Sequence, residues 1–151
     1  MSADLPADVV RRLHTHEDVQ VRRIVARRAD TPGEVLERLV GEHGESRKHG
    51  PGITRHPNFP PDAFIRLAGN EDPRRRALAA NGPDLPTGTL TALARDAEAF
   101  VRCAAARHRR LPVPVLDTLL ADDSPDVAQA AAANPVLPAD RMRALLDRAG
   151  L

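Results

Sequence analysis

The chain has few of the residues that build aromatic cores, disulfides and metal clusters. Its 151 residues contain no tryptophan or tyrosine, three phenylalanines and a single cysteine, Cys103. One cysteine cannot form an intramolecular disulfide or a cysteine-ligated cluster. No stretch approaches the roughly 20 apolar residues of a membrane-spanning helix, and the first residues lack the basic and apolar regions of a signal peptide. We therefore expect a cytoplasmic protein with an aliphatic core and no membrane segment.

An excess of charge of either sign is also missing. The 22 basic residues, of which only Lys48 is a lysine, nearly balance 21 acidic residues, and the net charge is +1. A chain this close to neutral has no general attraction to nucleic-acid phosphates. The lack of tryptophan and tyrosine also removes the best stacking partners for unpaired bases.

What the chain does have is an internal repeat. The phrase at 80–86, Ala-Asn-Gly-Pro-Asp-Leu-Pro, returns in similar form at 132–138. Self-similarity at this length predicts a solenoid that forms a single domain over 1–151. The repeats are marked by six prolines, separated by 26, 28, 26, 26 and 26 positions, which begin repeats one to six: Pro6, Pro32, Pro60, Pro86, Pro112 and Pro138.

Each repeat is expected to contain two helices. The first begins at the proline, whose fixed φ suits the first helical position, and carries large apolar residues at +4 and +7, counted from the proline, which lie on one face. At +12 stands a residue that we expect to cap the second helix by accepting free backbone N–H groups. These expected caps are Asp18, Asp72, Glu98 and Ser124.

The second helices are predicted at 21–26, 75–80, 101–106 and 127–132. Their small side chains allow close packing, so we expect them to line the inner side of a curved stack. The positions predicted to point inward are those at +18, whose side chains become smaller along the chain: Ile24, Leu78, Ala104 and Ala130.

Repeat two and the C-terminal repeat depart from this pattern. Residues 41–52 hold four glycines, Pro51 and the two extra residues of repeat two, and they predict an irregular loop. The sixth repeat has only its first helix, predicted at 138–149, with the polar outer face of a capping helix.

These phrases resemble the leucine-rich repeat variant family, whose repeats read Leu-Pro, spaced leucines, Asp, Val-Arg and Ala-x-Asn. The best agreement lies at 85–106 and 111–134, with 18–26 matching the Asp to Val-Ala part. The resemblance implies a right-handed all-α solenoid related in shape to HEAT-like repeats, in which α-helices alternate with short α or 3₁₀ helices. Here it would contain about five and a half two-helix repeats of roughly 26 residues and no strands. The family has no common catalytic residues, and the iron–sulfur cysteine cluster of some members is not present in this sequence.

Arginine recurs at +16, on the second helix. There it is expected to form a structural ladder by reaching the cap carboxylates of the same repeat. The arginines are Arg22, Arg76 and Arg102, and the expected acceptors are Asp18, Asp72 and Glu98.

A second set of cations lies where the second helices end. Three interpretations stay open: favourable placement at the negative end of a helix dipole, binding of an acidic protein partner, or binding of nucleic-acid phosphates. The candidate partner-binding residues are Arg27, Arg28, Arg55, His56, Arg107, His108 and Arg110.

Residues for catalysis or metal binding do not assemble into any recognisable pattern. His14 and His16 are two positions apart and do not share a helical face. His43, His49 and His56 lack a carboxylate or cysteine at ligand spacing. No histidine or acid is placed in sequence to activate Cys103. We therefore predict no enzyme, no catalytic residue, no cofactor and no metal.

The sequence favours a non-catalytic protein-interaction scaffold of unknown pathway, for which an acidic protein is one candidate partner. The alternative is a DNA-binding helical-repeat module that resembles HEAT-like DNA glycosylases and uses its arginine-rich edge. Alanines fill the predicted inner positions at 104–106 and 130–132, where a DNA-binding face would need arginine.

Overall fold

A computed structural model describes residues 5–45 and 52–150, and within these ranges every regular element is a helix. The predicted all-α class is therefore confirmed. None of these helices is long and apolar enough to cross a bilayer. The elements are α1 (Ala7–Leu13), α2 (Val19–Arg27), α3 (Gly33–His43), η2 (Ile53–Arg55, a 3₁₀ helix), α4 (Ala63–Ala68), α5 (Pro73–Ala79), α6 (Thr87–Ala94), α7 (Ala99–Ala106), α8 (Val113–Leu119), α9 (Pro125–Ala132) and α10 (Ala139–Ala149).

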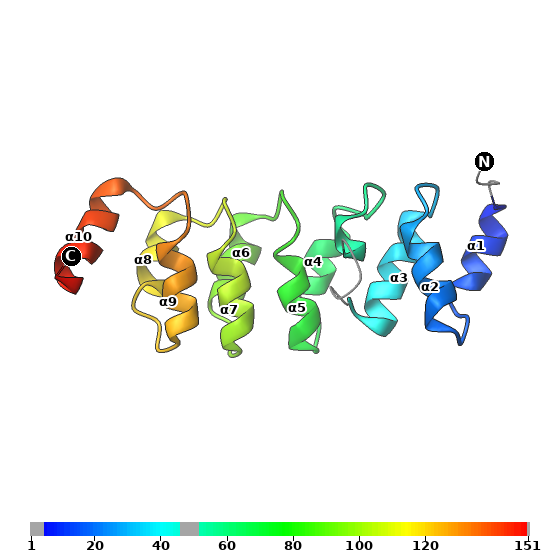
Figure 1. Cartoon of the computed structure of the whole chain (residues 1–151), viewed down its shortest axis with the longest axis horizontal. Helices are drawn as coiled ribbons and strands as arrows, with labels where there is room; N and C mark the ends of the chain where they lie inside the picture. The colour runs from blue at the N-terminus through cyan, green and yellow to red at the C-terminus, as the bar shows by residue number, and fades with distance from the viewer. Residues whose placement is uncertain (1–4, 46–51, 151) are drawn as a thin grey trace.

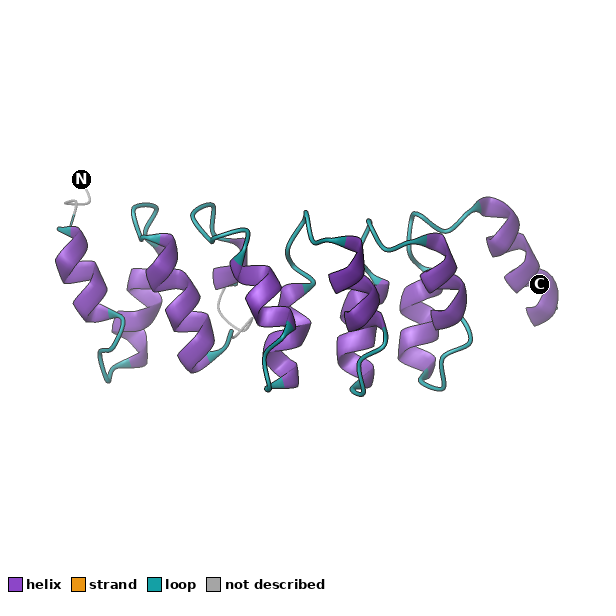
Figure 2. Cartoon of the chain, turned by 180° about the vertical axis from the view of Figure 1, so that it is seen from behind, coloured by secondary structure: helices purple, strands orange, loops and turns teal. Residues whose placement is uncertain are grey.

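The helices stand side by side in one elongated row, with the two ends of the chain at opposite ends of the row (Figures 1 and 2). From repeat three onward they form two layers. The first helices α4, α6 and α8 pack in sequence in one layer, while the second helices α5, α7 and α9 pack in the other (Figure 1). Such an arrangement, in which each repeat touches its neighbours, is that of a helical solenoid.

The core lies between these layers and is aliphatic, as expected. The +4 leucines Leu36, Leu90 and Leu116 are fully buried, as are Val101 and Val127 of the second helices. The +4/+7 rule fails in α10, where Met142 is about half exposed and no described side chain is fully buried. Leu145, at +7, is only half-buried.

The predicted inward positions are wrong by one residue in the second helices. Ile24 is 63% exposed, and Leu78 and Ala104 are only half-buried, although Ala130 is buried. The buried column is instead the one at +19: Val25, Ala79, Ala105 and Ala131. One residue turns a helix by 100°, which is enough to move a side chain from the core to the surface.

The prolines stand one position before the helices rather than at their first residue. Pro112 has φ −61° and ψ 139°, so it is the N-cap, and its carbonyl accepts the amide of Leu116 at 3.0 Å. Pro6, Pro32, Pro86 and Pro138 take the same place. In repeat three the helix starts later, at Ala63, with Asp62 as the N-cap.

Two of the four expected +12 caps are confirmed. The Asp18 carboxylate accepts the amide of Gln20 at 2.8 Å, and that of Asp72 accepts the amide of Arg74 at 2.9 Å. Glu98 and Ser124 occupy the N-cap position, but their side chains make no capping hydrogen bond. In those repeats the carboxylates of Asp96 and Asp122, at +10, accept the amides of the N-cap residues.

The irregular loop is shorter than predicted at its start. Because α3 continues to His43, residues 41–43 are helical, and Gly44, with φ 68°, ends the helix in a conformation that favours glycine. Residues 46–51 lie outside the described part of the chain. Glu45 and Thr54, which lie before and after this segment, are in direct contact. The Glu45 carboxylate accepts the Thr54 amide at 2.8 Å and the Thr54 hydroxyl at 3.0 Å.

Candidate interaction surface

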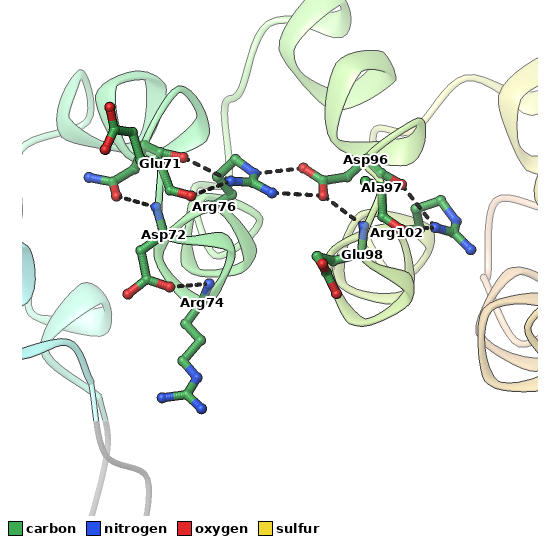
Figure 3. A network of polar contacts seen from close by, with 9 residues as sticks. Glu71, Asp72, Arg74, Arg76, Asp96, Ala97, Glu98 and Arg102 are labelled. Carbon is green, nitrogen blue, oxygen red and sulfur yellow. Dashed lines mark hydrogen bonds and ion pairs between the residues drawn. The ribbon is translucent and has the colours of Figure 1, made fainter.

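Two of the three arginines at +16, Arg76 and Arg102, bind forward, into the next repeat. Arg76 on α5 donates from Nε and Nη2 to the two carboxylate oxygens of Asp96, at 2.7 and 3.0 Å, and from Nη1 to the carbonyls of Asn70 and Glu71 (Figure 3). Its guanidinium therefore joins the turn of its own repeat to an acid in the following one. We call Arg22, Arg76 and Arg102 the arginine ladder.

The acceptors expected for this ladder were wrong. The arginines do not bind the +12 residues; Asp96 and Asp122, both at +10, take that role. These two carboxylates also accept the amides of Glu98 and Ser124, at 3.0 and 2.9 Å. The hydrogen bond from its arginine lowers the pKa of each carboxyl below its usual value, because it stabilises the charged form.

In other repeats a different side chain at +10 makes the same contact with the amide of the +12 residue. Asn70 Oδ1 accepts the amide of Asp72 at 2.9 Å, and His16 Nδ1 lies 3.1 Å from the amide of Asp18. Aspartate stands at +10 in repeats four and five, which follow Arg76 and Arg102, whereas repeat two, which follows Arg22, has Glu42 there. Arg22 makes the carbonyl bonds of the ladder, to His16 and Glu17. The ladder therefore stabilises the stacking of repeats.

A second set of polar side chains connects the loops that follow the second helices. His56 Nε2 lies 2.9 Å from the carbonyl of Arg28, and His108 Nε2 lies 2.8 Å from the carbonyl of Gly82. Asn134 donates to the carbonyls of Ala106 and His108 in the same way. We call His56, His108 and Asn134 the loop bridges.

The two imidazoles of the loop bridges have both nitrogens engaged. His56 Nδ1 accepts the amide of Asn58 at 3.0 Å, and His108 Nδ1 accepts the amide of Arg110 at 3.1 Å. A nitrogen that accepts an N–H carries no proton, so Nε2 carries it and donates to the carbonyl. The sequence pattern indicated these histidines as partner-binding candidates, and it could not indicate their carbonyl partners.

The seven candidate residues therefore divide into two groups. Three of them are buried or partly buried in the loops that follow the second helices: His56, His108 and Arg28. The Arg28 guanidinium pairs with Asp30 at 2.8 Å. Arg110 is exposed and pairs with Asp84 at 3.0 Å. The remaining three are exposed at equivalent positions, where the second helix or η2 ends: Arg27, Arg55 and Arg107.

These three arginines form an interrupted column. In repeat three the same position is Asn81, whose amide donates to the Thr54 hydroxyl at 3.0 Å, and in repeat five it is Ala133. The structure thus places cations in repeats one, two and four only. Their role in binding a partner stays a prediction.

The layer of second helices also exposes large apolar side chains that sequence reasoning missed. Ile24, on α2, was assigned to the inward face, and Phe100, on α7, is 46% exposed. The available signal was that Phe100 stands at +14, where the other second helices carry Gln20, Arg74 and Asp126. An aromatic residue at a position that is otherwise polar indicates a surface role.

Two pockets in the described ranges are large enough for a side chain or a small ligand. One, of about 530 Å³, lies between α7 and α9 and includes Arg107 and Cys103. The Cys103 thiol is buried and lies 3.7 Å from the carbonyl of Asp126. The other, of about 470 Å³, lies between the loops of repeats two and three. No group of three histidine, cysteine, aspartate or glutamate side chains in the described ranges is placed to hold a metal ion.

Comparison with known families identifies the type of repeat. The family model described as leucine rich repeat variant matches residues 19–41. This match supports the predicted family. The leucine rich repeat variant match covers α2 and most of α3, so it spans a second helix and the following first helix, rather than the segments at 85–106 and 111–134. A search of curated proteins and a search of solved structures gave no match.

Proposed function

We propose that the chain is a non-catalytic scaffold that binds an acidic protein partner through its layer of second helices. The observation that supports this proposal is the combination of exposed arginine and exposed large apolar side chains on the same helices. Ile24 and Arg27 lie three residues apart on α2, and Phe100 and Arg107 belong to α7 and its C-cap. Residues three or seven apart lie on one helical face.

Arginine and aromatic side chains are the types that dominate the energetics of protein interfaces. Arginine contributes both charge and a planar group that binds carboxylates through two hydrogen bonds. Arg76 and Arg102 form ion pairs with Asp96 and Asp122 between neighbouring repeats. We therefore expect the arginines exposed at the helix ends to attract an acidic partner.

DNA is a weaker candidate for this surface. A duplex presents an unbroken row of phosphates, whereas the column of arginines is interrupted at Asn81 and Ala133. Exposed apolar side chains such as Ile24 and Phe100 add little to a contact with phosphates but contribute directly to a protein interface.

The test compares two charge-reversed variants in the full chain. Immobilised wild type captures proteins from a cell extract, and mass spectrometry measures the same captures on Arg27→Glu/Arg107→Glu and on the control Arg95→Glu/Arg143→Glu, which changes equal charge elsewhere. We expect one set of proteins to be lost on the first variant and retained on the control. Equal capture by both variants contradicts the proposal.

A parallel titration addresses the DNA alternative. Fluorescence anisotropy with random duplex and single-stranded DNA at about 50 and 200 mM salt reports electrostatic binding, which weakens steeply as salt rises. We expect no binding at either salt concentration. Salt-dependent binding that disappears in Arg27→Glu/Arg107→Glu would favour the DNA-binding function instead.

A further inference from the structure

The junction between repeats two and three lacks the side chain that bridges its neighbours. At the position of the loop bridges, repeats two, four and five carry His56, His108 and Asn134, and each reaches a carbonyl of the preceding loop. Repeat three has Gly82 there. The Gly82 carbonyl therefore accepts a hydrogen bond from His108, but residue 82 has no side chain that could reach the loop of repeat two.

Phe64 explains why this position is glycine. A Cβ on residue 82 would lie 2.6 Å from the Phe64 Cγ, closer than such atoms approach. Phe64 stands at +4, where repeats two, four and five have Leu36, Leu90 and Leu116. Its ring fills the space of a bridging side chain and packs against Phe59, with 4.9 Å between centroids at 52°. Phe64 and Gly82 are thus a matched pair of substitutions.

A pocket of about 470 Å³ opens at this altered junction. Its walls are mostly apolar: Phe59 and Phe64 are buried, Leu85 is buried, and Ile65, on α4, is 48% exposed at the lip. Apolar pockets of about 300–1,000 Å³ are typical of ligand sites.

The rim of the pocket carries a cation that no described side chain neutralises. Asp84 pairs with Arg110 at 3.0 Å. Arg55, on the opposite loop, is exposed, and its side chain forms no ion pair or hydrogen bond with the described residues. An acidic group bound here would therefore meet Arg55.

The polar groups of the pocket leave little for a nucleotide or sugar to bind. Both ring nitrogens of His56 are engaged with backbone groups, and the amide of Asn81 donates to Thr54. A base or a sugar would need several uncommitted donors and acceptors, whereas an apolar side chain needs none. The pocket fits one hydrophobic side chain better than a polar ligand.

We propose that this pocket takes a large apolar side chain of a partner peptide, and that an acidic residue beside it in the peptide binds Arg55. The inference rests on the proposed function, since it names the segment through which an acidic protein partner docks. It locates the anchor of that partner at the junction of repeats two and three.

The probe is a library of random dodecapeptides displayed on phage and selected against the full chain. We expect a consensus with one leucine, phenylalanine or similar residue followed within three positions by aspartate or glutamate. A synthetic peptide of that consensus, followed by fluorescence anisotropy, should bind Arg55→Ala about tenfold more weakly, as for the loss of one charge-assisted contact. Arg95→Ala removes an exposed arginine that does not line this pocket, and we expect it to leave peptide affinity unchanged.

The second variant closes the pocket by copying the neighbouring repeat. Phe64→Leu/Gly82→His reproduces the combination of Leu90 and His108, so we expect it to fold with a loop bridge to the carbonyl of residue 56 and to bind the peptide at least tenfold more weakly. Unchanged affinity would overturn the proposal. If this variant does not fold, Ile65→Glu at the exposed lip replaces it, and a peptide that binds Ile65→Glu as tightly as wild type would overturn the proposal as well.

The two proposals fail in different ways. A library without enrichment, or a consensus without an apolar and an acidic residue, overturns the docking pocket while captures lost on Arg27→Glu/Arg107→Glu still support the scaffold. Captures unaffected by that charge reversal contradict the scaffold, whatever the library yields.

Discussion

Arg102 on α7 holds the carboxylate of Asp122, twenty positions later in the next repeat, with Nε 2.8 Å from Oδ2 and Nη2 2.9 Å from Oδ1. The same guanidinium donates from Nη1 to the carbonyls of Asp96 and Ala97, at 2.9 and 3.0 Å. Two parallel charge-assisted hydrogen bonds fix the relative position of the two groups. One side chain therefore satisfies a turn of its own repeat and sets the spacing to the next.

The ladder predicts how Asp122→Asn responds to pH. Arg102 lowers the pKa of the Asp122 carboxyl below its usual 3.8, so the pair stabilises the fold fully above the unfolded pKa, and this contribution is lost as the pH falls through the lower folded pKa. Asparagine keeps the turn, as Asn70 does, but not the charge. We expect the variant to have a lower Tm at pH 7 and a difference from wild type that shrinks below about pH 4.

Thermal melts followed by circular dichroism at pH 7, 4 and 3 measure this difference. Asp126→Asn serves as the control, because Asp126 is exposed and makes no ion pair within the described residues. A Tm difference for Asp122→Asn that is constant over this pH range would show that the ion pair does not contribute.

The loop bridges predict a difference between two substitutions of one histidine. His108→Ala leaves the Gly82 carbonyl and the Arg110 amide without their partners, and we expect a loss of about 1–3 kcal/mol in the free energy of unfolding. His108→Asn copies Asn134 and should lose less than half of that. Urea unfolding of both variants gives the comparison, and equal losses would mean that the ring contributes by packing alone.

The phase of the second helices can be tested at two adjacent residues. Val25 is 1% exposed and Ile24 is 63% exposed. We expect Val25→Ala to lower the free energy of unfolding by about 2 kcal/mol through lost burial and a cavity, and Ile24→Ala to change it by less than about 0.5 kcal/mol. Urea unfolding measures both, and the opposite order would place Ile24 in the core.

Arg75 is a charged residue at a core position. It stands at +15, where Val101 and Val127 are fully buried, and its Nε is buried without a hydrogen-bond partner in the described chain. Arg75→Met keeps the aliphatic stem and removes the unpaired group, so we expect the free energy of unfolding to rise by about 1 kcal/mol. Arg74→Met, at the exposed neighbour, is the control. A destabilised Arg75→Met would reveal a favourable interaction of the guanidinium.

Periodicity was enough to predict the helices and most of the core, because a large apolar residue every 26 or 28 residues at +4 has only one face to occupy in a stack. It was not enough to phase the second helices. Ile24 and Val25 are adjacent and equally apolar, so only packing against neighbouring helices decides which one is buried.

The polar contacts were beyond sequence reasoning for a different reason. The partners of His56 and His108 are backbone carbonyls, which every residue has. The match between Phe64 and Gly82 depends on two residues 18 positions apart that meet only in the folded chain. The arginine ladder was predicted, but its acceptors lie in the following repeat, in a direction that spacing alone does not give.

The forward direction of the arginine ladder determines how a gene of this kind can lengthen. Suppose that 86–111, one unit of 26 residues, is duplicated in tandem. The original Arg102 then faces the copy of Asp96, and the copied Arg102 faces Asp122, because donor and acceptor stay twenty positions apart. Duplication by whole units therefore creates no unpaired charge at the new boundary, and the chain can change its length without first acquiring compensating mutations.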